Sequence, residues 1–188
     1  MIVEVLVISI IAGLVRGGSI LNLKNIRFRG GYFLLIGLAI NLLSFIIIKN
    51  SNDDLGKFLY GNLSFIQVST LFLVVVGLLF NYREIGFSIV SAGIILNMIP
   101  ISLNRGRMPV AEWALKAVNL GDTLSKIKEG IVIDKILINS NTNFNFLGDI
   151  IPIEYPFPKV VSLGDIFIAL GIFLIIQKYM TLSQPLQD

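Results

Sequence analysis

The sequence predicts an all-α polytopic membrane bundle of about five transmembrane helices, with one long extracytoplasmic loop that carries an amphipathic interfacial helix. Composition is the first reason: 55% of the 188 residues are hydrophobic and only 14% are charged, against about 25% charged in soluble domains. The second is that five apolar runs approach the ~20 residues that a helix needs to cross a bilayer. We place the spans at 2–17, 32–48, 61–80, 85–103 and 162–180 and the loop at 104–159, within a single integral membrane domain, 1–188.

The first run is the shortest, and Glu4 lies in its second turn. It either spans with a thin margin or lies partly in the interface. A cleaved signal peptide would need a basic segment before the apolar run and small residues after it. Neither is present, and Arg16 follows the run directly, so we interpret it as a retained helix.

The charges between the runs predict the orientation. Residues 16–30 contain four Lys and Arg residues and no acid, and the positive-inside rule assigns such a segment to the cytoplasm. The N-terminus and the 104–159 loop then lie outside, and the C-terminal end lies inside. The loop itself carries seven Lys and Arg residues, which argues against this orientation.

Missing residue types narrow the chemistry. The chain has no Cys and no His, which excludes disulfides and thiolate-held metals and removes the usual zinc and haem ligands. We therefore expect no metal, no cofactor and no catalytic residue. The net charge is only +3 and the basic residues are scattered, so nucleic acid is not an expected partner.

The long loop is the unusual part of the chain. Pro109 is placed to start a helix, and an apolar stripe at helical spacing follows it, ending before Gly121. The helix either lies on the bilayer surface or packs on the bundle. We further expect a short polar helix at 122–129, a strand or re-entrant segment at 131–138, a turn at 139–145 and no helix at 150–158. The stripe comprises Val110, Trp113, Ala114, Ala117 and Val118.

One candidate binding site emerges from the loop and its borders. Arg105 and Arg107 flank a glycine just before Pro109, and their guanidinium groups could hold a phosphate or a carboxylate. Asp149 and Asp165 each follow a glycine near the same membrane boundary. We expect Asp149 to pair with one of the arginines, whereas capping of the last helix alone would explain Asp165. The candidate ligand-binding or partner-binding residues are Asn104, Arg105, Gly106, Arg107, Met108, Pro109, Trp113, Gly148, Asp149, Gly164 and Asp165.

Two alternatives concern these arginines. Arg105 could simply extend its charged end to the lipid headgroups, and Arg107 could form a structural ion pair instead of binding a ligand. Inside the apolar runs, Asn41 and Asn97 could line one cavity. Hydrogen bonding between helices is the alternative for both asparagines.

Four stretches of the sequence resemble a known bacterial family. They are Leu-Val-Arg-Gly-Gly-Ser at 14–19, Asn-Arg-Gly-Arg-Met-Pro-Val at 104–110, Leu-Gly-Asp-Ile-Ile-Pro at 147–152 and Ser-Leu-Gly-Asp at 162–165. The family consists of small polytopic membrane proteins and is catalogued as a domain of unknown function. The resemblance implies a location in the bacterial cytoplasmic membrane and implies no activity.

The favoured hypothesis is a non-enzymatic membrane protein that binds a lipid, a small amphiphile or a partner subunit through its outer loop. Its expected partners are membrane lipids, with a larger membrane complex or a homo-oligomer as further possibilities. One alternative is a small transporter or the substrate-binding component of one. Another is a membrane enzyme acting on lipid-linked substrates, with Asp149 or Asp165 as base and Arg107 holding a phosphate.

Overall fold

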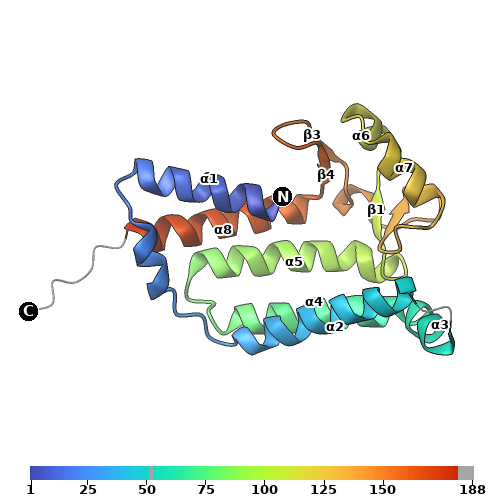
Figure 1. Cartoon of the computed structure of the whole chain (residues 1–188), viewed down its shortest axis with the longest axis horizontal. Helices are drawn as coiled ribbons and strands as arrows, with labels where there is room; N and C mark the ends of the chain where they lie inside the picture. The colour runs from blue at the N-terminus through green and yellow to red at the C-terminus, as the bar shows by residue number, and fades with distance from the viewer. Residues whose placement is uncertain (51–52, 182–188) are drawn as a thin grey trace, which may run out of the picture.

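The protein is mostly helical, and its five longest helices run alongside one another (Figure 1). The computed structural model describes residues 1–50 and 53–181. The long helices are α1 (Ile2–Val15), α2 (Gly31–Asn50), α4 (Leu63–Leu79), α5 (Ile85–Leu103) and α8 (Leu163–Thr181). The shorter elements are η1 (Ile20–Asn25), α3 (Asp54–Gly61), β1 (Met108–Val110), α6 (Glu112–Ala117), α7 (Gly121–Lys128), β2 (Lys135–Leu137), η2 (Asn145–Leu147), β3 (Ile151–Ile153) and β4 (Lys159–Val161).

Three helices, α2, α5 and α8, are long and apolar enough to cross a membrane. Helices α3 and α4 form a fourth candidate as one span broken by a 66° bend. The fifth expected span corresponds to α1, which has only 14 residues. The structure therefore supports a multi-pass membrane protein with three or four such spans, and a membrane crossing by α1 stays a prediction.

Helix α5 lies at the centre of the bundle, between α4 and α8, while α2 packs on α4 and α1 packs on α8. Glycines bring α5 and α8 unusually close together. A Cβ atom added to Gly93 would lie 2.5 Å from the carbonyl oxygen of Gly164, and one added to Gly171 would lie 2.6 Å from that of Gly86. In a membrane, such small residues let van der Waals packing hold two helices together.

Residues 104–162 form an outer subdomain at one end of the bundle, between α5 and α8 (Figure 1). It contains a parallel sheet of β1 and β2 and an antiparallel sheet of β3 and β4. Its small core is separate from the bundle core and includes Val110, Ala114, Leu115 and Ile127. The expectation of an all-α protein is thus corrected to a mostly helical one, with four short strands among the residues that the structure describes.

The expected helix start at Pro109 is wrong, because Pro109 lies in the middle of β1. The flanking residues make the bonds toward β2: the Met108 N–H donates to Asp134 and the Val110 carbonyl accepts from Ile138. The missing N–H of proline therefore costs no bond with β2. The helix begins instead after Ala111, at Glu112.

The expected stripe of α6 is buried in part: Val110, Ala114 and Val118 are buried, but Trp113 and Ala117 are exposed. Ala111, Ala114, Leu115 and Val118 are buried in the outer core, whereas Trp113 is 62% exposed. The helix packs on α7, β3 and β4. Contact between α6 and the bilayer stays a prediction, and Trp113 is the side chain available for it.

Elsewhere in the loop the local expectations are confirmed. The polar helix is α7, and the 131–138 segment contains strand β2, which is one of the two forms expected for it. The 139–145 segment contains a turn at residues 140–141 and a bend at residue 143, and 150–158 contains strand β3 and no helix.

Candidate functional site

A tight turn after α5 positions Arg107 at the junction of bundle and outer subdomain. The side chain of Asn104 donates to the carbonyl oxygens of Pro100 at 2.7 Å and Asn143 at 2.8 Å, which ends the helix and ties it to the outer subdomain. Arg105 and Gly106 both have positive φ, 56° and 79°. A Cβ atom on Gly106 would lie 2.7 Å from the backbone at the start of α4, so this approach requires glycine.

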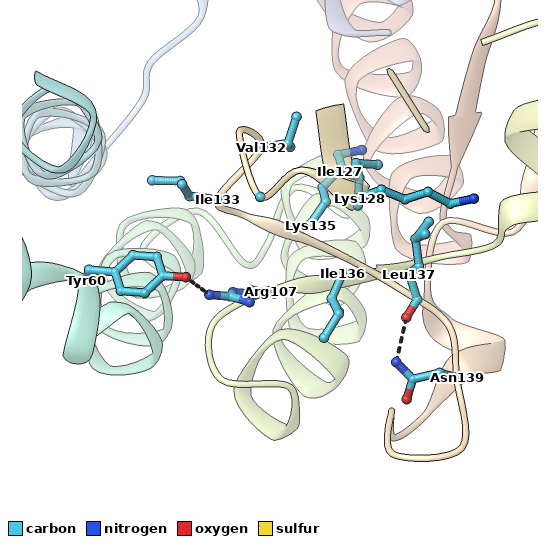
Figure 2. A pocket seen from close by; sticks show the side chains of 11 residues that line it. Tyr60, Arg107, Ile127, Lys128, Val132, Ile133, Lys135, Ile136, Leu137 and Asn139 are labelled. Atoms are coloured by element: carbon cyan, nitrogen blue, oxygen red, sulfur yellow. Dashed lines mark hydrogen bonds between the residues drawn. The ribbon is translucent and has the colours of Figure 1, made fainter. Parts of the chain in front are cut away.

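The Arg107 side chain faces Tyr60 of α3 across this junction (Figure 2). Its guanidinium group donates to the Tyr60 hydroxyl, and the guanidinium carbon lies 5.3 Å from the centre of the ring, in cation–π range. The Nε atom of Arg107 is buried and has no hydrogen-bond partner. A buried donor without an acceptor costs about 1–3 kcal/mol, so the guanidinium retains an unused donor for an anion.

Arg107 lines a cavity of about 320 Å³, which is at the lower end of the range for small-molecule sites. Two further cations, Lys128 and Lys135, contribute to its wall, and none of its eleven lining residues is acidic. We call this the cationic pocket. Its lining residues are Tyr60, Arg107, Ile127, Lys128, Gly130, Val132, Ile133, Lys135, Ile136, Leu137 and Asn139.

Asp149 pairs with Lys135, at 2.7 Å, and not with either arginine. The backbone explains this partner: the Asp149 N–H donates to Pro109 at 2.8 Å and its carbonyl accepts from Ala111 at 3.0 Å, which fixes Asp149 beside β1. Strand β2, which carries Lys135, lies on the other side of β1. Asp149 is only 4% exposed, so the pair is largely withdrawn from water.

The environment shifts both pKa values of this pair. Burial raises the pKa of the Asp149 carboxyl, and the opposing attraction of Lys135 does not cancel this effect. For Lys135, burial acts to lower the pKa, but the attraction and hydrogen bond of Asp149, together with the attraction of Asp134 and Asp165, outweigh it and the pKa is raised. Lys135 therefore carries its positive charge at neutral pH.

Asp165 and Gly164 belong to the junction between α5 and α8. The Asp165 carboxylate accepts from Asn97 at 3.0 Å and from the Ser162 N–H at 3.1 Å, and its own N–H donates to the Ser162 hydroxyl at 3.0 Å. This is the helix-capping arrangement that was the alternative for Asp165. Gly164 packs directly against Asn97.

The two asparagines of the apolar runs, Asn41 and Asn97, join different pairs of helices. Asn41 of α2 donates to Gln67 of α4 at 3.1 Å, and its bond to Thr70 is 3.4 Å long. Asn97 joins α5 to the start of α8. Both contacts are hydrogen bonds between elements, which was the alternative to cavity lining.

The remaining predicted residues do not line the cationic pocket. Met108 and Pro109 are buried in β1, and a Cβ atom on Gly148 would lie 2.4 Å from the carbonyl oxygen of Pro109. Arg105 is exposed, and neither Arg105 nor Trp113 lines the pocket. Of the predicted site residues, only Arg107 lines the cationic pocket.

Sequence reasoning missed Tyr60, Lys128 and Lys135. Tyr60 comes from a different part of the chain, and Lys128 belongs to a short polar helix whose outer face is charged. Lys135 did leave a signal: the pair Asp134-Lys135 interrupts an apolar run, Ile131 to Ile138, and charges within a buried strand need partners. In the described parts of the chain, no group of three or more His, Cys, Asp or Glu residues could hold a metal ion.

A comparison with protein families matches residues 25–177 to DUF5317, a family of unknown function. The chain belongs to DUF5317. This confirms the resemblance expected from the four sequence stretches, and the DUF5317 region includes every residue of the cationic pocket. An uncharacterized protein of Thermotoga maritima is 26% identical over 179 residues, covering 93% of this chain and 89% of its own length. No solved structure matches the chain.

Proposed function

We propose that this DUF5317 member is a non-enzymatic protein of the bacterial cytoplasmic membrane that binds an anionic amphiphile in its cationic pocket. One observation carries the proposal: Arg107, whose buried Nε has no hydrogen-bond partner, lines a cavity that is also lined by Lys128 and Lys135. Guanidinium groups bind phosphate and carboxylate through paired N–H donors, and ammonium groups add attraction without directionality.

The position of the pocket favours a ligand that comes from the membrane. Its walls come from α3, from the turn that ends α5, and from α7 and β2 of the outer subdomain. Two of these parts continue directly into membrane-crossing helices, so the pocket lies where lipid headgroups would lie. Phospholipids supply an anionic group at that depth.

The chemistry of the pocket favours binding over catalysis. A general base must be able to accept a proton, but the raised pKa of Lys135 keeps its ammonium charged. The Tyr60 hydroxyl is already bonded to Arg107, and Asp149, which is engaged by Lys135, lies outside the pocket wall. Association with a larger membrane complex or with a second copy of the chain stays a prediction.

For the orientation, we propose that the outer subdomain and the N-terminus lie outside and that the chain ends inside. The opposite end of the bundle supports this, because Arg27, Arg29 and Arg83 line a cavity of about 620 Å³ there. Arginines gathered at one end of a bundle are typical of the cytoplasmic side.

The test compares two matched arginine substitutions. Arg107→Gln removes the charge in the pocket, and Arg105→Gln removes an exposed charge two residues away. With the protein in detergent and phosphatidylglycerol as probe, we expect native mass spectrometry to show binding about tenfold weaker or worse for Arg107→Gln. Arg105→Gln should bind like the wild type. Equal binding by all three proteins, each with an unchanged Tm, would reject the proposal.

A further inference from the structure

A second cavity adjoins the cationic pocket and has a different character. It has a volume of about 460 Å³ and is lined by Phe45, Ile46, Lys49 and Asn50 of α2 and by residues 131–134 of the outer subdomain. Five of its eight lining residues are apolar. We call it the apolar cavity.

The two cavities share a wall. Val132 and Ile133 line both of them, so the 131–134 segment separates the guanidinium of Arg107 from the side chains of Phe45 and Ile46. In Figure 2, Ile133 lies toward Tyr60, and Val132 lies further along the segment, toward Ile127 and Lys128. A molecule that occupied both cavities would place a charged group and an apolar group on opposite sides of this segment.

The apolar cavity lies against a helix that faces lipid. Only 11% of the membrane-crossing window of α2 is buried inside the protein, and this helix has a mean hydropathy of 2.4. Phe45 and Ile46 belong to its last two turns, at the end where the outer subdomain lies. A hydrocarbon chain can therefore reach the cavity sideways from the membrane without crossing water.

The charges of the cationic pocket indicate what kind of ligand it takes. Lys135 is paired with Asp149, and Lys128 shares Glu112 with Lys116. Among the described side chains that line the cationic pocket, Arg107 is the cation that has no salt bridge to a carboxylate. A singly charged anion bound at Arg107 would neutralise this guanidinium group, which favours a monoanion as the ligand.

We propose that the ligand is a membrane glycerophospholipid with a monoanionic phosphodiester headgroup, of which phosphatidylglycerol is the simplest example. Its phosphate binds at Arg107 in the cationic pocket, and one acyl chain lies in the apolar cavity against α2. This rests on the proposed function, since it names the class of ligand for the same site.

The test measures separately how much the headgroup and the acyl chains contribute to binding. Native mass spectrometry of the full chain in detergent compares dioleoyl phosphatidylglycerol, the chain-free headgroup glycerophosphoglycerol, and dioleoyl phosphatidylcholine at equal concentrations. Each buried methylene is worth about fourfold in affinity, so phosphatidylglycerol should bind more than tenfold tighter than glycerophosphoglycerol. It should also bind several-fold tighter than phosphatidylcholine, whose headgroup carries no net charge.

The second part of the experiment uses a variant of the apolar cavity. Ile131 lines only the apolar cavity and is 55% exposed, and Ile20, at the other end of the bundle, is 50% exposed. We expect Ile131→Asn to weaken phosphatidylglycerol binding several-fold and to leave glycerophosphoglycerol binding unchanged. Ile20→Asn should change neither.

The outcomes distinguish the two proposals. If glycerophosphoglycerol binds as tightly as phosphatidylglycerol and Arg107→Gln abolishes both, the anion site stands and the acyl-chain proposal fails. If phosphatidylcholine binds equally well, the monoanion proposal fails. If binding does not depend on Arg107, the proposed function itself fails. The comparison of ligands on the wild-type chain tests the acyl-chain proposal and the monoanion proposal even if Ile131→Asn does not fold.

Discussion

At the scale of single residues, the outer subdomain contains a buried carboxylate, that of Asp149, paired with the half-buried ammonium group of Lys135. Asp149 is 4% exposed and bonds Lys135 at 2.7 Å. A buried ion pair contributes little net stability, but removal of one partner leaves an uncompensated charge in a poorly solvated place. The same pair keeps a cation in the wall of the cationic pocket, so it links the stability of the subdomain to its proposed ligand.

Asp149→Asn should therefore destabilise the outer subdomain. The substitution leaves the Lys135 ammonium without its carboxylate, at a cost of about 1–3 kcal/mol in the free energy of unfolding. The measurement is the Tm of the purified chain in detergent. Glu154→Gln, at an exposed turn, removes the same charge and serves as the control. If both variants melt at the wild-type temperature, the ion pair has no structural role.

At the scale of elements, Glu112 joins α6 to α7. Its carboxylate lies 2.9 Å from Lys116 on the same helix and 3.2 Å from Lys128 of α7. Lys128 also lines the cationic pocket, so Glu112 helps to hold one wall of it. The hydrogen bond from Lys116, and then that from Lys128, lowers the pKa of Glu112 below its ordinary value of 4.5.

This shift makes the stability contribution of Glu112 depend on pH. A depressed carboxyl pKa stabilises the folded state above pH 4.5, and the contribution disappears as the pH falls through the folded pKa. The wild type should therefore be more stable than Glu112→Gln at pH 7, and the difference in Tm should vanish toward pH 3. A difference that persists or grows in acid would contradict the assignment.

The helices were predictable from sequence because apolar composition and length alone identify a membrane helix. The strands were harder to predict from sequence. Strand β1 pairs with a segment more than twenty residues further along the chain, and the local pattern after Pro109 favoured a helix. At the site, Arg107 stood out because two arginines and a glycine follow an apolar run. The partner of Asp149 could not be predicted, because it depends on the alignment of three separate chain segments at β1.

At the scale of the whole molecule, the bundle gives the chain two unlike ends. The outer subdomain, the start of α1 and the bend between α3 and α4 lie together at one end, and Lys159 of the subdomain pairs with Glu4 of α1. The opposite end holds η1 and the arginine-lined cavity. Each crossing helix connects these ends, so the orientation of one segment determines that of all the others.

The absence of native cysteine allows a clean test of this orientation. Asn141→Cys introduces a thiol in an exposed turn of the outer subdomain, and Lys24→Cys introduces one at the opposite end. In intact spheroplasts, a membrane-impermeant maleimide should label the first variant, and it should label the second only after permeabilisation. The reverse labelling pattern would place the cationic pocket on the cytoplasmic side.

The central claim is that Arg107 holds an anionic membrane lipid. The most direct measurement is the amount of phosphatidylglycerol that the chain retains when it is purified gently from its own membranes, quantified per chain by mass spectrometry. The wild type and Arg105→Gln should retain similar amounts, and Arg107→Gln should retain several-fold less at an unchanged Tm. Equal retention by Arg107→Gln and the wild type would contradict the claim.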